Sequence, residues 1–283
     1  MTEKNILGRI NSIKDQLPRA EKKIAEFILD KPEEVVNMTA SKLGTASESS
    51  AATVIRLCKR VDISSFTQLK VLISREVTHT NPVGYSDITP DEPLEDIMDK
   101  LLGNAFQTMQ DTVSVIQEHP LLEAVEAMKA SSIIYLFGIG ASSLVAENIA
   151  HKWSRIGKTC ISFKDPHALL AAMSSTKKGQ VFIGVSNSGE TKEIIKIMEL
   201  AKENGSQTIA LTQFGKNSLT KKADISLQHV RAQEGAVRSA ATSSLHAQFI
   251  LVDILFYAYA SKNYDKIIDQ IRYSREQIEK YSS

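Results

Sequence analysis

Apolar residues near the amino end of the chain recur at helical spacing in a series of short segments. Ile6, Ile10 and Ile13 fall on one face of a first helix, and Pro18 stands where a second helix begins. Similar segments follow, separated by short polar stretches. The pattern predicts an all-α domain over residues 1–77.

Two of these short helices are separated by only a tight turn. The first is predicted over residues 39–44 and closes with Gly44, because glycine is common just after a helix C-terminus. The second is predicted over residues 51–61, with Ser50 as its N-cap. Its core-facing side chains are predicted to be Val54, Ile55, Leu57, Cys58 and Val61. An amphipathic helix over residues 66–77 closes the domain.

The polar face of the second helix carries candidate DNA-binding side chains. We predict that Thr53, Arg56, Lys59 and Arg60 are exposed there. Two short helices about a tight turn are typical of a helix-turn-helix, in which the start of the second helix reaches base edges and basic residues contact phosphates. An arginine can also pair bidentately with guanine. An ordinary helical bundle with a solvated basic face fits the same pattern.

Residues 78–93 are rich in turn-forming residues and poor in large apolar side chains. Asn81, Pro82 and Gly84 are examples. We interpret this stretch as a linker between the helical domain and a second domain over residues 94–283.

The second domain begins with helical spacing and then alternates β-forming runs with helices. This alternation predicts a parallel sheet covered on both faces, hence a doubly wound α/β fold of about five strands. The predicted strands are residues 133–137, 158–163, 181–185, 207–212 and 223–227. The predicted helices are residues 94–118, 121–128, 144–156, 166–173 and 192–203, with a short helix after the fourth strand.

Two further helices are predicted at residues 241–260 and 263–280. The first is apolar nearly all round, which requires burial in its own core or against a second subunit. The second is amphipathic. The sequence leaves two alternatives open, since these helices either cover the sheet or contribute to an oligomer surface.

Residues 181–191, Val-Phe-Ile-Gly-Val-Ser-Asn-Ser-Gly-Glu-Thr, are predicted to form a strand, a tight turn and the start of a helix. Such a turn presents free N–H groups and the positive end of the helix dipole to an anion. Ser186, Ser188 and Thr191 add hydroxyl donors, and Gly189 allows close backbone approach. We therefore predict a phosphate cradle, although a serine-rich helix cap fits the same residues.

A second serine-bearing turn follows the first predicted strand, at residues 138–143. Its sequence, Gly-Ile-Gly-Ala-Ser-Ser, resembles half of a dinucleotide fingerprint, but Ser143 stands in place of the third glycine. No acidic residue closes the next strand, so we expect no nucleotide cofactor. Two such turns at strand ends suit a phosphorylated small molecule with several hydroxyls.

Composition and charge add a few limits. The net charge is +1, but residues 1–80 carry thirteen Lys and Arg against ten Asp and Glu. Cys58 and Cys160 form no CxxC motif, so we expect reduced thiols and no zinc site. No signal-peptide core begins the chain, and its longest apolar run, residues 249–260, is interrupted by Asp253. These features predict a cytoplasmic protein without a membrane partner.

Residues 1–77 resemble the helix-turn-helix domain of the RpiR/MurR family of bacterial sugar-phosphate regulators. The resemblance rests on Leu-Gly-Thr-Ala-Ser-Glu-Ser-Ser-Ala-Ala-Thr-Val-Ile-Arg-Leu-Cys-Lys-Arg-Val at residues 43–61 and on Ser-Phe-Thr-Gln-Leu-Lys at residues 65–70. Ser49 and Asp62 stand where the family usually has Val and Gly. We expect these two departures to loosen the turns around the second helix.

Residues of about 125–265 resemble a SIS (sugar isomerase) domain. This resemblance rests on Gly-Ile-Gly-Ala-Ser at residues 138–142 and on Ser-Asn-Ser-Gly-Glu-Thr at residues 186–191. Together with the helix-turn-helix, the resemblance covers nearly the whole chain in the order that the family has.

The resemblance implies a transcription factor, usually a repressor, whose operator affinity changes when a phosphosugar binds. N-acetylmuramic acid 6-phosphate is the leading ligand, and a homodimer or homotetramer is expected. The DNA-contacting candidates are Ser50, Ala51, Thr53, Arg56, Lys59 and Arg60. The ligand-binding candidates are Ser142, Ser143, Ser186, Asn187, Ser188, Gly189, Thr191 and Glu234, of which Ser186, Ser188 and Thr191 are expected to hold the phosphate.

The rival function is an enzyme on the same fold, either an aldose–ketose phosphate isomerase or an etherase. Such a reaction needs a general base. The candidates are Glu147, Glu190, Glu234, His151, His167 and His246, and no two of them stand at a telling spacing. Because an isomerase has no use for a basic second helix, we expect no catalytic residue and no turnover. A protein-interaction module is a third alternative.

Overall fold

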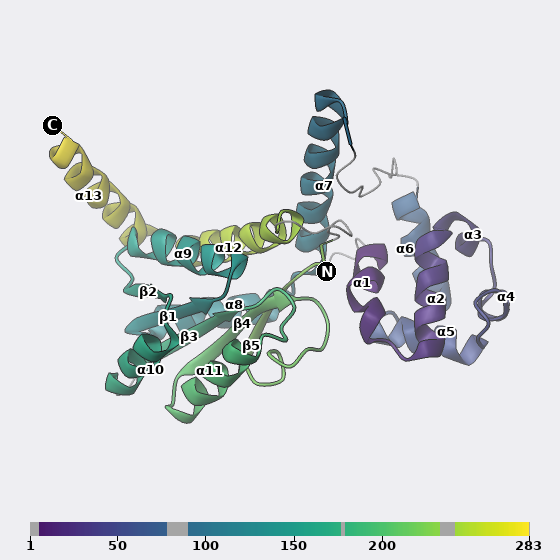
Figure 1. The fold of residues 1–283 in the computed structure, drawn as a ribbon, viewed down its shortest axis with the longest axis horizontal. Helices are drawn as coiled ribbons and strands as arrows, with labels where there is room; N and C mark the ends of the chain where they lie inside the picture. The colour runs from purple at the N-terminus through teal and green to yellow at the C-terminus, as the bar shows by residue number, and fades with distance from the viewer. Residues whose placement is uncertain (1–5, 78–89, 177–178, 233–240, 283) are drawn as a thin grey trace. The chain divides into compact units, whose positions relative to one another are not determined.

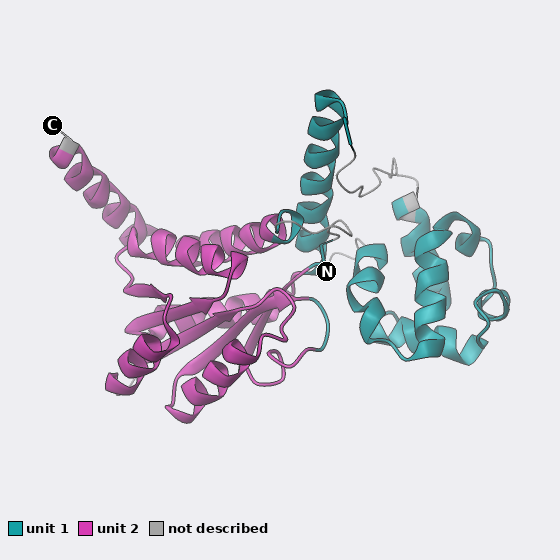
Figure 2. Cartoon of the chain, viewed as in Figure 1, with its two compact units in different colours: residues 1–115, 214–216, 230–244 teal, residues 116–213, 217–229, 245–283 magenta. Residues whose placement is uncertain are grey.

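The computed structural model describes residues 6–77, 90–176, 179–232 and 241–282. The chain divides into two compact units, shown in Figure 2. The first comprises residues 1–115, 214–216 and 230–244, and the second comprises residues 116–213, 217–229 and 245–283. Most of the predicted linker, residues 78–89, lies outside the described residues. The domain boundaries given above therefore stay a prediction.

The amino-terminal part is all-helical, as predicted. Its elements are α1 (Ile6–Ile13), a 3₁₀ turn (Lys14–Gln16), α2 (Arg19–Asp30), α3 (Pro32–Val36), α4 (Ala40–Ala46), α5 (Ala51–Arg60) and α6 (Phe66–Val77). Helix α7 (Leu94–Val115) follows the linker. Isoleucine and leucine side chains from α1, α2, α4, α5 and α6 are fully buried, which gives these short helices a common core. They include Ile10, Ile24, Ile28, Leu43, Leu57, Leu69 and Ile73.

Gly44 does not end α4, which corrects the prediction made for it. The helix continues to Ala46, and Gly44 is buried inside it. A Cβ atom at Gly44 would lie 2.7 Å from the carbonyl carbon of Ser50 and 2.8 Å from the amide nitrogen of Ala51. The glycine is therefore explained by the close approach of α4 to the start of α5.

The second unit contains one sheet of five parallel strands (Figure 1). The strands are β1 (Ile133–Gly138), β2 (Cys160–Phe163), β3 (Gln180–Val185), β4 (Gln207–Gln213) and β5 (Ile225–His229). Their order is β2-β1-β3-β4-β5. The chain moves outward from β1 to β2 and then returns to β3 on the other side of β1. The predicted doubly wound α/β fold is thereby confirmed, and its topological switch point lies between β1 and β3.

Helices cover both faces of this sheet (Figure 1). Helices α8 (Glu118–Ala130), α9 (Ala141–Ser154) and α12 (Ser243–Lys262) share a core with one face, through side chains such as Trp153 and Leu255. Helices α10 (Pro166–Ser175) and α11 (Lys192–Glu203) share a second core with the opposite face, which includes Phe182 and Met198. The apolar helix α12 thus covers the sheet.

The prediction of a short helix after β4 was wrong. Residues 218–222 form turns instead. The Asn217 Oδ1 atom accepts a hydrogen bond of 2.9 Å from the Thr220 amide, and the Asn217 amide donates to Thr220 Oγ1 at 3.1 Å. Local bonds of this kind offer the backbone an alternative to helix, which explains the difference.

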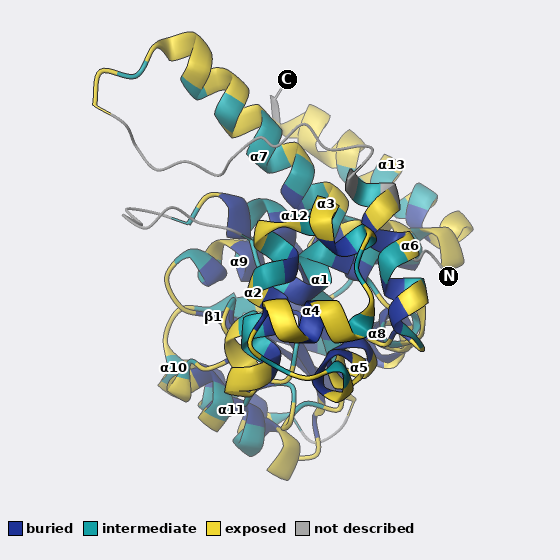
Figure 3. Ribbon diagram, turned by 90° about the vertical axis from the view of Figure 1, so that its right-hand side faces the viewer, coloured by how far each residue is buried: buried dark blue, intermediate teal, exposed yellow. Residues whose placement is uncertain are grey.

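Helices α7 and α13 (Tyr264–Ser282) carry many of the exposed large apolar side chains, and α7 is yellow over much of its length in Figure 3. On α7 these are Leu94, Met98, Leu101, Leu102, Phe106 and Val113; on α13 they are Tyr264, Tyr273, Ile278 and Tyr281. The amphipathic character predicted for α13 is visible near its start, where Ile267 is buried. The role of these surfaces in an oligomer stays a prediction.

Both cysteine thiols are buried and free. Burial raises the pKa of the Cys58 thiol to about 11 and that of the Cys160 thiol to about 12. Among the helices of the described residues, none combines the length and the apolar composition that crossing a bilayer requires.

Replacing Gly44 by alanine is expected to destabilise the amino-terminal helices. The added methyl group must displace the backbone of Ser50 and Ala51. Overpacking of this kind costs about 1–3 kcal/mol, and the better helix propensity of alanine offsets at most ~1 kcal/mol. Scanning calorimetry should show a lower unfolding temperature. The exposed position Lys42 on the same helix provides the control, Lys42→Ala, and equal unfolding temperatures for both variants would contradict the close-packing explanation.

Candidate functional site

The two serine-bearing turns leave neighbouring strands at the same edge of the sheet. In the parallel pairing of β1 with β3, Gly138 lies opposite Val185. The chain enters α9 directly after β1 and α11 after the longer turn of residues 186–191. Both turns therefore lie at the carboxyl edge beside the switch point, where open α/β sheets bind their ligands.

A hydrogen bond between Ser186 and Thr191 links the two ends of the turn after β3. The side-chain oxygens of these residues lie 2.9 Å apart and share a hydrogen bond. Ser186 is only 2% exposed, and its Oγ atom also accepts a bond of 3.1 Å from the Gly189 amide. These two hydroxyls thus fix the shape of the turn, and the one that accepts in this pair keeps a proton to donate.

Gly189 is required by the packing beneath the turn. It has a φ of +69°, and a Cβ atom there would lie 2.2 Å from the Cγ atom of Asn217. Asn217 is itself buried and its side-chain nitrogen donates to Thr212 Oγ1 at 3.3 Å. The Gly189 carbonyl accepts from the Leu219 amide at 2.9 Å, so the turn is anchored to the segment after β4.

Ser188 and Asn187 present further hydrogen-bonding groups at this turn. Ser188 is exposed, and its Oγ atom accepts from the Glu190 amide at 3.2 Å, which leaves its proton to donate. The Asn187 carbonyl accepts from Gln213, but the buried Oδ1 atom of Asn187 has no partner among the described residues. An unsatisfied buried acceptor at this place can receive a hydrogen bond from a ligand.

The amino end of α11 is not capped by a side chain. Thr191 occupies the N-cap position but makes no cap bond, because its hydroxyl pairs with Ser186. By contrast, α10 is capped by Asp165, which accepts from the Ala168 amide at 2.7 Å. The first N–H groups of a helix lack intrahelical acceptors, so an uncapped start suits an anion.

The turn after β1 is similar but tighter. Gly140 stands at the N-cap of α9 and provides no side chain to cap it. The Ser143 Oγ atom donates to the Gly140 carbonyl at 2.7 Å, and Ser142 is buried. Glu234, the remaining predicted ligand contact, lies outside the described residues.

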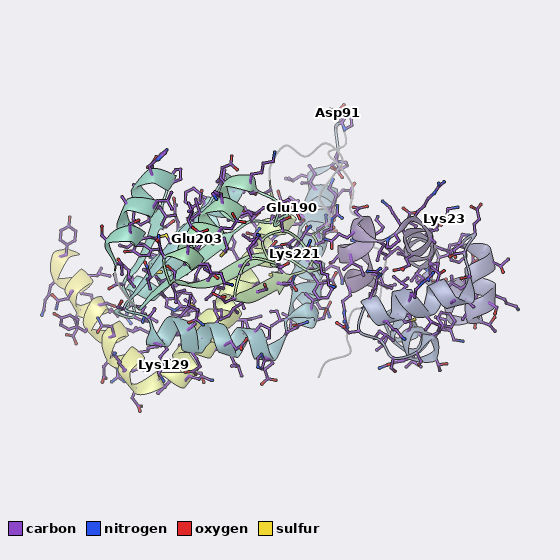
Figure 4. The ribbon with its side chains drawn as sticks, turned by 90° about the horizontal axis from the view of Figure 1, so that it is seen from below. Lys23, Asp91, Lys129, Glu190, Glu203 and Lys221 are labelled. Atoms are coloured by element: carbon purple, nitrogen blue, oxygen red, sulfur yellow. The ribbon has the colours of Figure 1, made fainter. Side chains whose placement is uncertain are left out.

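Two of the candidate general bases have local partners and two are exposed, while the buried Nδ1 atom of a fifth, His246, has no partner among the described residues. Glu147 pairs with Lys164 at 3.1 Å, and Glu190, labelled in Figure 4, accepts from the Ser218 amide at 2.9 Å. His151 and His167 are exposed. Glu147 and Glu190 are thus each paired with a local partner.

Helix α5 begins as predicted, with Ser50 as its N-cap, and Ser50 Oγ accepts from the Thr53 amide at 3.2 Å. Ser50 is exposed and Ala51 is half-buried, while Arg56, Lys59 and Arg60 are exposed as predicted.

The prediction was wrong for Thr53 and Ile55 on α5. Thr53 was predicted to be exposed but is buried, and Ile55 was predicted to be buried but is exposed. Thr53 is only 3% exposed and Ile55 is 36% exposed. The Thr53 hydroxyl is hydrogen-bonded to Ser50 Oγ at 2.9 Å and accepts from Arg56 Nη2 at 2.8 Å. A buried hydroxyl is tolerated when it is satisfied in this way, which explains the orientation of the helix.

Glu21 on α2 was not among the predicted functional residues, and its side chain is only 5% exposed. Its Oε2 atom accepts from Arg60 Nε, and its Oε1 atom lies 3.9 Å from Arg56 Nε. The spacing of Glu21 to Ile24 and Ile28 places it on the buried face of α2, and this signal was present in the sequence.

Asp62 adopts the left-handed backbone conformation that glycine favours, with a φ of +55°. Its carboxylate accepts from Arg9 Nη2 at 3.1 Å. Ser49 lies half-buried in the turn before α5. The effect of these two departures on the turns stays a prediction.

Each of the two parts of the chain matches a known protein family model. Residues 4–80 match the family model described as helix-turn-helix domain, rpiR family, and residues 128–258 match the SIS domain model. The HTH-type transcriptional regulator YbbH of Bacillus subtilis is 36% identical over 273 residues, which is 96% of each chain.

Two solved structures show similar folds. The NanR protein of Vibrio vulnificus, complexed with ManNAc-6P, is 27% identical with a TM-score of 0.61, over 97% of this chain and 98% of that one. The sugar isomerase domain of an RpiR transcription factor from Sphaerobacter thermophilus is 22% identical with a TM-score of 0.53, over 64% of this chain and 97% of that one, and shows the fold alone. The chain therefore belongs to the rpiR family of HTH-type transcriptional regulators, with a helix-turn-helix domain followed by a SIS domain.

Proposed function

We propose that this regulator is a repressor whose operator affinity changes when a phosphorylated N-acetyl amino sugar binds at the carboxyl edge of β1 and β3. The observation that carries the proposal is the uncapped start of α11 beside the exposed Ser188 hydroxyl. The similarity to NanR, whose structure contains ManNAc-6P, supports an amino-sugar phosphate. N-acetylmuramic acid 6-phosphate belongs to the same chemical class and stays our leading candidate.

In this proposal the phosphate is bound by neutral groups. The first N–H groups of α11 and the Ser188 hydroxyl contact the phosphate, while Ser186, Gly189 and Thr191 shape the turn. Asn187 Oδ1 accepts a hydrogen bond from the sugar. Ser142, Ser143 and Glu234 contact the sugar or its phosphate.

Helix α5 contacts the operator in this proposal. Arg56 reads a base, Lys59 and Arg60 contact phosphates, and Ser50 and Ala51 approach the DNA at the helix start. A homodimer or homotetramer would present two such helices to half-sites about 34 Å apart or a multiple of that distance. Ligand binding has to favour one arrangement, and a coupling of about 1–3 kcal/mol changes operator affinity 5- to 150-fold.

An isomerase or etherase is the alternative activity on this fold, and we propose that the chain has neither. Glu147 and Glu190 are held by local partners. Incubation of the full chain with hexose and amino-sugar phosphates should give no isomerised or cleaved product, and turnover would overturn this part of the proposal.

A thermal-shift panel of sugar phosphates tests the binding step. A true ligand at 100 times its dissociation constant stabilises the folded chain by about 2.7 kcal/mol. We expect ManNAc-6P or N-acetylmuramic acid 6-phosphate to raise the unfolding temperature, and the unphosphorylated sugars to leave it unchanged. A panel in which no phosphosugar shifts the transition would contradict the proposed class of ligand.

The substitution Ser188→Ala should weaken the ligand and leave operator binding intact. The Ser188 side chain is exposed and accepts a hydrogen bond only from the Glu190 amide. Removal of its hydroxyl therefore does not disturb the buried part of the turn. We expect a higher dissociation constant for the phosphosugar by calorimetry and a blunted response of operator binding. Ser174→Ala is the control, because Ser174 is an exposed serine on α10. Equal ligand affinity in the Ser188→Ala chain would rule out the cradle.

The substitution Arg56→Ala should reduce operator affinity by roughly 1–3 kcal/mol and relax specificity at one base pair, if Arg56 reads a base. Gel-shift titration at fixed salt measures the affinity, and a set of single-base operator variants measures the specificity. Unchanged operator binding would refute the assigned role of Arg56.

A further inference from the structure

Thr53 was a candidate for DNA contact, but it lies inside the domain. Only 3% of Thr53 is exposed, whereas 62% of the Arg56 side chain is exposed one helical turn later. The two residues are joined by the bond from Arg56 Nη2 to Thr53 Oγ1, at 2.8 Å. A threonine so deeply buried acts on DNA only through the arginine that it holds.

Glu21, on a different helix, forms a longer ion pair with the same arginine. Its Oε1 atom lies 3.9 Å from Arg56 Nε, and its Oε2 atom accepts from Arg60 Nε. A carboxylate that is 95% buried requires compensation, and the two arginines of α5 provide it. Ser50, Thr53, Arg56, Glu21 and Arg60 therefore form one connected network across α2 and α5.

The contacts use one particular edge of the Arg56 guanidinium. Nε faces Glu21, and Nη2 donates to Thr53, so the edge formed by these two nitrogens is turned toward the protein. Nη1 has no acceptor among the described residues. The end formed by Nη1 and the second proton of Nη2 stays directed away from these partners, and it can donate two parallel bonds.

We propose that Thr53 and Glu21 are positioning residues that set the orientation in which Arg56 reads a base. The proposal rests on the role of Arg56 given under Proposed function. An arginine side chain has many rotamers, and fixing it before contact favours the base that matches its one orientation over the other bases. Removing the contact of Thr53 or Glu21 lets the Arg56 side chain sample more rotamers. Discrimination between bases then falls, while the attraction of the helix to DNA phosphates stays.

The test uses the full chain and a duplex selected by the wild-type protein from a randomised DNA library. A second duplex differs only at the base pair where Arg56→Ala loses discrimination. We expect Glu21→Gln and Thr53→Val each to lower the ratio of the two affinities by about fivefold or more, as found for residues in one hydrogen-bond network. The affinity for unrelated DNA should not fall.

A double-mutant cycle separates positioning from mere stability. In the Arg56→Ala background, Glu21→Gln and Thr53→Val should cause no further loss of the ratio. Glu34→Gln is the matched control, because Glu34 is an exposed carboxylate paired with Lys31 at 3.1 Å in the same domain. It should leave the ratio unchanged.

Three results would overturn the proposal. The first is an unchanged ratio in both variants. The second is an equal loss of affinity for both duplexes and for unrelated DNA, in step with a lower unfolding temperature. The third is a further loss of the ratio in the Arg56→Ala background. If Glu21→Gln does not fold, the near-isosteric Thr53→Val decides. Two other results would contradict the proposed function instead. They are a wild-type chain that selects no DNA sequence, and an Arg56→Ala chain that discriminates between bases as the wild type does.

Discussion

The parallel pairing of β1 with β3 is the constraint on which the SIS domain depends. Both strands end level at one edge, because Gly138 lies opposite Val185. The helices that follow them take opposite faces of the sheet, α9 on one and α11 on the other. The chain therefore leaves the same edge of the sheet twice, toward opposite faces. The N-termini of α9 and α11 lie at this edge because of the strand pairing, and no contact between the two turns is needed.

The electrostatics of this edge follow from the same geometry. The turn of residues 186–191 contains no Lys or Arg, so an anion there meets oriented N–H groups and hydroxyls rather than mobile cations. A helix dipole acts only within the first turn, so its usefulness depends on the exact course of the backbone. The buried bonds of Ser186 and Asn217 maintain that course and matter as much as any group that touches a ligand.

The sheet and most helices could be predicted because buried strands and amphipathic helices repeat their apolar residues regularly. Side-chain orientation on α5 could not, since hydropathy does not count the hydrogen bonds that let Thr53 be buried while Ile55 is exposed. The spacing of Glu21 indicated the buried face of α2, but hydropathy does not indicate which side chains compensate its buried charge. The segment after β4 follows the side chain of Asn217 rather than helical propensity. In each case a specific polar contact overrides the general pattern, and one-dimensional periodicity carries no information about such contacts.

The burial of both cysteines has a practical consequence. A thiol reacts with electrophiles as its thiolate, and with pKa values of about 11 and 12 Cys58 and Cys160 hold almost none of that form at neutral pH. A cysteine introduced at an exposed position of α5 would then be the thiol that a maleimide dye modifies in the folded chain. The natural sequence is thus already suited to site-specific fluorescent labelling of helix α5, without removal of its own cysteines.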